Sequence, residues 1–172
     1  SRNLAAYDRI ARETWDHSVQ VAAIARVLAR HLGRVQPDEA MMAGLVHNIG
    51  VYYLLYRAAE HPEYRNNEPA MIELLAGWHE SIGESLLHIL GVPPSITEAV
   101  HDQSRLRNIE TPCTVSDILY FSIMLAGSDL AWQANPGPAA ESSAHEANLA
   151  RYADLLLEAE DDIADLRATL AA

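Results

Sequence analysis

The sequence predicts an all-α protein, a multi-helix bundle with an added C-terminal helix. Alanine and leucine dominate, clusters of β-branched residues are sparse, and apolar residues recur at helical spacing. Proline and glycine separate these periodic stretches. The chain has 172 residues, of which 49% are hydrophobic, which is enough for one globular domain with a core.

The first predicted helix covers residues 4 to 32 and ends at Gly33. His17 continues an apolar row with Val21, Ile24 and Leu28, so its side chain faces the interior. Such a histidine is either a core residue whose ring nitrogens are hydrogen-bonded or a ligand of a metal ion.

The second helix begins at Pro37 and ends in the polar pair His47-Asn48. Gly50 permits a break or a close backbone approach, after which residues 51–59 resume helical character. Residues 61–69 are bounded by prolines and predict a polar surface loop.

A helix over residues 70–90, broken near Gly77, is expected to place His79 and Gly83 on one face. A short helix over residues 95–104 and a long one over 114–132 follow.

The composition of residues 133–147 predicts a linker. A last helix over residues 148–172 has apolar residues spaced alternately by three and four, as in a coiled-coil seam. They are Leu149, Tyr152, Leu156, Ala159, Ile163, Leu166 and Leu170. This helix either packs on its own domain, residues 1–132, or forms a homodimer through residues 148–170.

The formal net charge of -12 argues against nucleic acid as a partner, because no cluster of Lys and Arg could displace the counterions of a phosphate backbone. No apolar run is long enough to span a membrane, so no membrane partner is expected. The single cysteine, Cys113, fits a reducing cytoplasm.

Three histidines from three predicted helices, His17, His47 and His79, could meet beside Asn48. Imidazoles bind Zn, Ni, Fe or Mn, and such a group is a common route to a metal site in a helical protein. The alternative is a hydrogen-bonded polar core.

Four stretches resemble the HD-related output domain (HDOD) family of the HD superfamily, across about residues 14–131. The matching residues are Trp15-Asp-His17-Ser18, Gly44-Leu-Val-His47-Asn48-Ile49-Gly50, Trp78-His79-Glu80-Ser-Ile-Gly83 and Leu90-Gly-Val-Pro93. The family's N-terminal helical half is not evident, so we expect a fragment or a shortened relative. The resemblance implies an HD-type bundle and bacterial signal transduction.

Catalytic HD proteins are similar to metal-dependent phosphohydrolases that use a His, a His-Asp pair and a later Asp. By this resemblance His17 and His47 match the two histidines, while Asn48 and Gly127 stand where the two aspartates are expected. Asp129 is two residues further on, about 200° around a helix, and is predicted to point elsewhere. The pocket expected from the resemblance consists of His17, His47, Asn48, His79, Glu80 and His101.

Losing both carboxylates makes a two-metal site unlikely to form, because an amide brings no charge and bridges two ions poorly. We therefore expect a non-catalytic signalling domain that binds a protein or a small ligand and needs no cofactor. The alternative is a phosphohydrolase acting on a nucleotide or cyclic dinucleotide. A single divalent ion held weakly by His17, His47 and His79 is compatible with either function.

Overall fold

The computed structural model describes residues 2–105, 107–127, 129–133 and 143–172, and all regular elements in these ranges are helices. The prediction of an all-α protein is therefore confirmed. The helices are α1 (Arg2–Leu32), α2 (Pro37–Val46), α3 (Ile49–Ala58), α4 (Pro62–Arg65), α5 (Glu68–Leu90), α6 (Pro94–His101), α7 (Val115–Ala126), α8 (Ser143–Glu158) and α9 (Glu160–Ala171). None of the described helices is long and apolar enough to cross a membrane.

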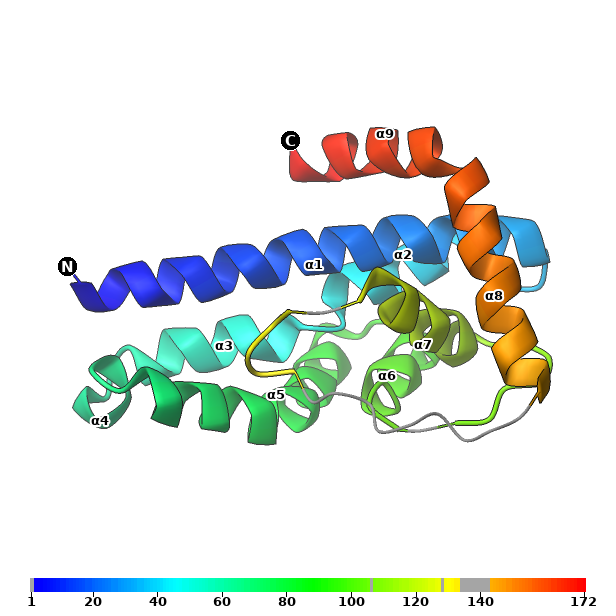
Figure 1. Cartoon of the computed structure of the whole chain (residues 1–172). Coiled ribbons are helices and arrows are strands. Elements are labelled where there is room, and N and C mark those ends of the chain that lie inside the picture. The colour runs from blue at the N-terminus through cyan, green and yellow to red at the C-terminus, as the bar shows by residue number, and fades with distance from the viewer. Residues whose placement is uncertain (1, 106, 128, 134–142) are drawn as a thin grey trace.

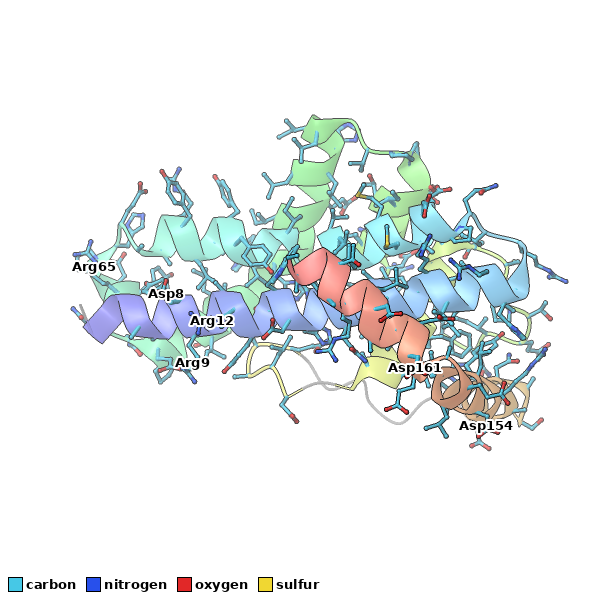
Figure 2. All side chains as sticks on the ribbon, turned by 90° about the horizontal axis from the view of Figure 1, so that it is seen from above. Asp8, Arg9, Arg12, Arg65, Asp154 and Asp161 are labelled. Carbon is cyan, nitrogen blue, oxygen red and sulfur yellow. The ribbon has the colours of Figure 1, made fainter. Side chains whose placement is uncertain are left out.

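Helix α1 runs the length of the molecule, and most other helices are arranged around it (Figure 1). Helices α2 and α3 follow α1 on one side, and α5 lies against α3. Helix α9 crosses the face of α1 that is turned away from α3, as the views in Figures 1 and 2 agree. Helix α1 is thus packed from more than one side, which explains its mostly apolar second half.

Helix ends follow local signals in the sequence. Gly33 and Gly91 have positive φ angles of 70° directly after α1 and α5, a conformation that glycine adopts without strain. Pro37 occupies the first turn of α2, where its missing N–H costs nothing. Thr114 and Asp117 form a reciprocal capping box at the start of α7.

Two glycines allow helices to approach closely. A Cβ atom at Gly44 would lie 2.5 Å from Cα of Ala22, so α2 contacts the backbone of α1. A Cβ atom at Gly50 would lie 2.0 Å from the carbonyl oxygen of His79, so α3 contacts the backbone of α5. The Gly50 contact confirms the close approach predicted from the sequence, and it brings the His47-Asn48 pair next to His79.

Two of the apolar clusters of the interior lie at the two ends of α1. Tyr7 and Ile10 pack with residues of α3 and α5 at one end, and Trp132 joins them. At the other end Ile24 and Leu28 pack with α7, α8 and α9. Between these clusters α1 carries the buried polar residues Thr14 and Ser18 together with His17. The polar site therefore lies between two apolar regions.

Several predicted boundaries are wrong. The predicted loop 61–69 contains the short helix α4, which Pro62 begins. Helix α5 continues through Gly77, where a Cβ atom would meet nothing within 4 Å, so that glycine marks no contact. Helix α7 ends at Ala126 and not near residue 132, because Gly127 turns the chain with φ 67° and ψ 173°.

The C-terminal prediction also needs correction. Residues 134–142 of the predicted linker 133–147 lie outside the described residues, but α8 begins at Ser143, inside the rest of that range. The predicted single helix over 148–172 is two helices, with Ala159 between them. This break lets α8 pack against α7 while α9 returns along α1, so that both bury apolar side chains.

The coiled-coil residues face the domain itself. Tyr152 and Ile163 are buried in the cluster with Ile24 and Phe121, and Leu149, Leu156, Ala159 and Leu166 pack against its edge. The alternating spacing of these apolar residues therefore reflects packing of α8 and α9 on their own domain. A homodimer through residues 148–170 stays a prediction.

Candidate functional site

Three helices bring the predicted histidines together. His17 comes from the middle of α1, His47 caps the C-terminus of α2, and His79 comes from α5. The ring centres of His17 and His47 are 5.7 Å apart. The charges of His17 and His79, when these residues are protonated, both lower the pKa of His47, so the three imidazoles influence one another.

His47 is completely buried, with 0% of its surface exposed. Its Nδ1 lies 2.6 Å from the carbonyl oxygen of Gly44, and since a carbonyl only accepts, Nδ1 carries the proton. Nε2 then presents a lone pair, and it has no hydrogen-bond partner among the described residues. Burial, and then the charge of His17, lower the pKa of His47 to about 3, so it is neutral near pH 7.

Asn48 is 1% exposed and follows His47 at the turn between α2 and α3. Its Nδ2 donates a hydrogen bond of 3.3 Å to Oγ of Ser18 on α1. Its Oδ1 is buried and has no partner in the described part of the chain. The turn is held from a third side by Gln103, whose Nε2 donates to the carbonyl oxygen of His47 at 3.0 Å.

His79 is 6% exposed, and burial lowers its pKa to about 4. Its ring meets the ring of Trp132 edge-on, with centres 4.7 Å apart. The indole Nε1 of Trp132 donates to Oγ1 of Thr14 at 3.3 Å, which ties the segment after α7 to α1. Trp132 is not among the site residues predicted from the sequence, because its pattern places it at the end of a helix.

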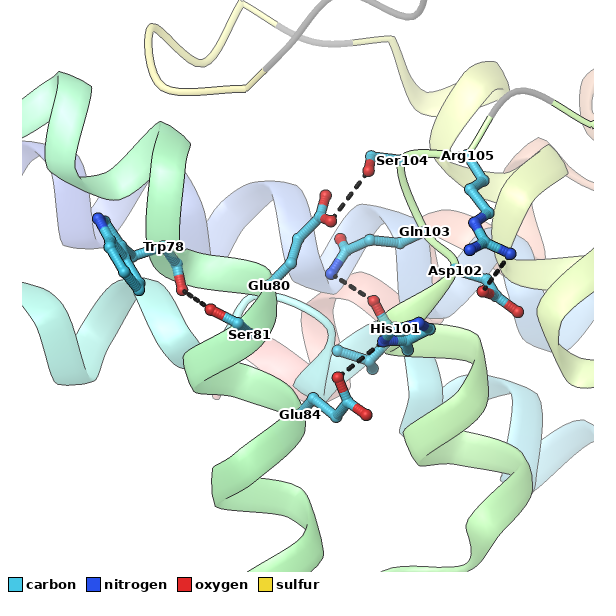
Figure 3. A network of polar contacts seen from close by, with 10 residues as sticks. Trp78, Glu80, Ser81, Glu84, His101, Asp102, Gln103, Ser104 and Arg105 are labelled. Carbon is cyan, nitrogen blue, oxygen red and sulfur yellow. Dashed lines mark hydrogen bonds and ion pairs between the residues drawn. The ribbon is translucent and has the colours of Figure 1, made fainter.

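The other two predicted pocket residues differ: Glu80 is near His79, whereas His101 pairs with Glu84 (Figure 3 shows Glu80 with Ser104 and His101 with Glu84). Oε1 of Glu80 is 4.0 Å from Nε2 of His79, and its other oxygen accepts a hydrogen bond of 2.9 Å from Ser104. His101 is exposed, and its Nδ1 is 2.7 Å from Oε2 of Glu84. It belongs to a surface network between α5 and α6, because α6 turns its apolar face to the core and His101 away from it.

The position of Asp129 differs from the prediction that this side chain points away from the site. Because α7 ends at Ala126, the helical angle that pointed Asp129 elsewhere does not apply. Asp129 lines a cleft of about 540 Å³ together with His17, Glu13 and Asp16. Gly127, at the position of the expected aspartate, lines the same cleft without contributing a ligand atom. The site is therefore acidic on the side of His17.

The donor set does not fit the paired metal centre of catalytic HD proteins. Throughout the ranges that the structure describes, no three His, Cys, Asp or Glu side chains lie close enough together to bind a metal ion. Position 48 supplies an amide, which bridges two dications poorly. Burial lowers the pKa of all three histidines, so each favours its neutral, ligand-competent form. Binding of a single ion by these imidazoles stays a prediction.

The fold and the site define a helical domain in which histidines from α1, α2 and α5 converge at a close crossing of α3 and α5. A family model described as "HDOD domain" matches residues 2–106. The chain therefore belongs to the HDOD family, and the predicted resemblance is confirmed. The match starts earlier and ends earlier than the range predicted from the motifs, and α7, α8 and α9 lie beyond it.

A solved structure has a similar fold: the crystal structure of an HDOD domain protein with unknown function from Geobacter sulfurreducens. The TM-score is 0.55 and the sequence identity 16%, and the alignment covers 92% of this chain. The chain spans 61% of the length of that protein. No curated protein matches the chain.

Proposed function

We propose that this chain is a regulatory domain of bacterial signalling that acts by binding a protein or a small ligand and does not hydrolyse phosphate esters. The observation that carries this proposal is the environment of Asn48. The residue beside the second histidine is a buried amide that donates to Ser18, where a catalytic relative is expected to have a metal-binding carboxylate.

The surrounding charges support the same function. A phosphate ester needs a metal or an arginine to offset its charge. The cleft beside His17 is instead lined by Glu13, Asp16 and Asp129, and the imidazoles are neutral at pH 7. This arrangement repels a phosphate.

The second candidate is a surviving phosphohydrolase, and the position of Asp129 favours it. Asp129 lines the same cleft as His17, so the segment after α7 places a carboxylate near the first expected ligand. In that case His17, His47 and His79, together with Asp129, would have to move closer together than they lie in this structure to hold an ion, and the ion would supply a polarised water.

Metal analysis and an activity assay separate the two candidates. We expect the freshly purified protein to contain well under one metal ion per chain and to leave a generic phosphodiester substrate intact when Mn²⁺ is added. Stoichiometric metal together with turnover that is lost in His47→Ala would establish the phosphohydrolase. His101→Ala is the matched control, because His101 is exposed and lies outside the site.

A further inference from the structure

A small pocket that none of the histidines lines lies between the first turns of α1 and the helix α3. Its volume is about 220 Å³. Three tyrosines and one carboxylate form its walls: Tyr7, Asp8, Tyr52 and Tyr56. A space of this size accommodates one small planar group and is too small for a nucleotide, since drug-sized ligands need roughly 300 Å³ or more.

Helical spacing explains how the pocket forms. Tyr52, Tyr56 and Ala59 recur at intervals of four and three on one face of α3, and Tyr7 and Ala11 are one turn apart on α1. The two alanines are short, so the space between the aromatic rings is left open. Figure 2 shows Asp8 on the edge of α1 that runs along α3.

The walls offer groups that recognise an organic cation. Tyr7 is 7% exposed, so its ring forms a buried part of the wall. Tyr56 is 70% exposed, so its ring is free to close over a ligand. Aromatic faces attract cations, and the exposed carboxylate of Asp8 adds a negative charge.

The side chain of Arg65 is hydrogen-bonded to a residue of the pocket wall. Nε of Arg65 donates to the carbonyl oxygen of Ala59 at 3.0 Å, and its charge acts on Tyr7. Arg9, on the same helix as Asp8, pairs with Glu68 of α5. A bound cation would therefore compete with the charge of Arg65 but not with that of Arg9.

We propose that this pocket binds a guanidinium group, carried by a free small molecule or by an arginine side chain of a partner. A guanidinium stacks on a tyrosine ring and has several N–H donors for the Asp8 carboxylate. A quaternary ammonium has the charge but no donor. The pocket is separate from the histidine site, so this proposal does not depend on the proposed function.

The test is a titration of the full chain with methylguanidinium, followed through the NMR signals of the tyrosine rings. N-methylurea has a similar shape without the charge and is the matched control ligand. We expect saturable shifts with methylguanidinium only. Asp8→Asn and Tyr56→Leu should each weaken binding about tenfold. Arg65→Gln should strengthen it.

Tyr53→Leu is the matched control variant, because Tyr53 is 39% exposed on the same helix but does not line the pocket. All these variants change exposed side chains, so the fold is expected to persist.

A second titration with the peptide N-acetyl-Gly-Arg-Gly-amide distinguishes the two sources. Tighter binding of the peptide than of methylguanidinium assigns the pocket to an arginine of a partner, and weaker binding assigns it to a free molecule. Equal responses to methylguanidinium and N-methylurea, or a Tyr53→Leu effect as large as that of Tyr56→Leu, would overturn the proposal.

Discussion

Asn48 donates a hydrogen bond to Ser18 that a carboxylate at the same position could not donate. A charge at this position, which is 1% exposed, would need a cation beside it to offset its desolvation. The nearest imidazoles, His17 and His47, resist protonation because burial lowers the pKa of each. At the scale of the residue, the amide is therefore the side chain that suits this turn.

Replacing Asn48 by aspartate tests this balance. Without metal, we expect Asn48→Asp to lower the free energy of unfolding by about 2–4 kcal/mol at pH 7, because it leaves a buried charge unpaired. Added Zn²⁺ should restore much of that loss, since the carboxylate would complete a ligand set with the histidines. Urea unfolding with and without Zn²⁺ measures both effects.

Asn67→Asp is the control, because Asn67 is an exposed helix cap that accepts from the backbone N–H of Ala70, and a carboxylate accepts equally well. An Asn48→Asp variant that is as stable as the parent chain and does not respond to Zn²⁺ would contradict the account.

The buried histidines predict how stability depends on pH. The pKa values of His47 and His79 in the folded chain, about 3 and about 4, lie below the ordinary value of 6.5. The unfolded chain therefore binds protons first as the pH falls below 6.5, and stability decreases from there until the folded values are passed. At pH 5 each histidine should cost about 2 kcal/mol relative to pH 7.

Chemical unfolding at pH 7 and pH 5 checks this expectation. The variant His47→Gln should lose about 2 kcal/mol of the difference in stability between the two pH values, whatever its stability at pH 7. A pH dependence that is unchanged in His47→Gln would show that other groups cause it.

The sequence predicted the convergence of His17, His47 and His79, because the apolar rows around them fix which side of each helix faces inward. It did not predict the contributions of Trp132 and Asp129. Both depend on where α7 ends, and the φ angle that Gly127 adopts decides that end. No periodic pattern in the sequence reports this angle.

At the scale of the element, the crossing of α3 over α5 holds the site together. Gly50 lies against the backbone of His79, so any side chain at position 50 would push α3 away from α5. That movement would also displace the turn that carries His47 and Asn48, because this turn directly precedes α3.

We expect Gly50→Ala to destabilise the chain by about 3 kcal/mol or more, because its Cβ atom would overlap a backbone carbonyl that cannot rotate away. Gly77→Ala is the control on α5, since nothing lies within 4 Å of its Cβ position. It should stabilise the chain by about 0.5–1 kcal/mol, the helix preference of alanine over glycine. Thermal unfolding of both variants tests the pair, and a mild effect of Gly50→Ala would show that the helices have room to separate.

The start of α8 lies within the range that the composition of the chain predicts to be a linker. Residues near 140 resemble a linker, yet His145 lies on α8, is fully buried and accepts a hydrogen bond of 3.3 Å from the backbone N–H of Ile109. The spacing of His145, Leu149, Tyr152 and Leu156 is four, three and four. Extending the apolar row upstream by one turn would have found this histidine, because a buried imidazole can replace an apolar residue in such a row.

At the scale of the whole molecule, α8 and α9 close one end of the core. Tyr152 of α8 is 1% exposed, and its ring meets that of Phe121 with centres 5.3 Å apart. Ile163 of α9 is buried in the same cluster as Ile24 and Leu28 of α1. The C-terminal helices are thus integral to the core, although they lie beyond the family match.

Removing the Tyr152 ring should therefore destabilise the whole chain. We expect Tyr152→Ala to lower the free energy of unfolding by about 3 kcal/mol, as for other large aromatic residues in a core. Leu157→Ala, five residues along the same helix at a position 73% exposed, should change it by less than about 0.5 kcal/mol. Denaturant unfolding followed by circular dichroism measures both, and similar effects of the two variants would show that α8 is only loosely attached.

The polar residues Thr14 and Ser18 in the middle of α1 have a further consequence for folding. A helix that packs on α2, α3, α7, α8 and α9 could slide along its axis by one turn and still bury apolar residues. Such a slide would separate Thr14 from the Trp132 indole and Ser18 from the Asn48 amide, and it would leave these polar groups against apolar neighbours. The same residues that border the histidines thereby select a single axial register for the longest helix, a reason to retain them that is independent of any ligand.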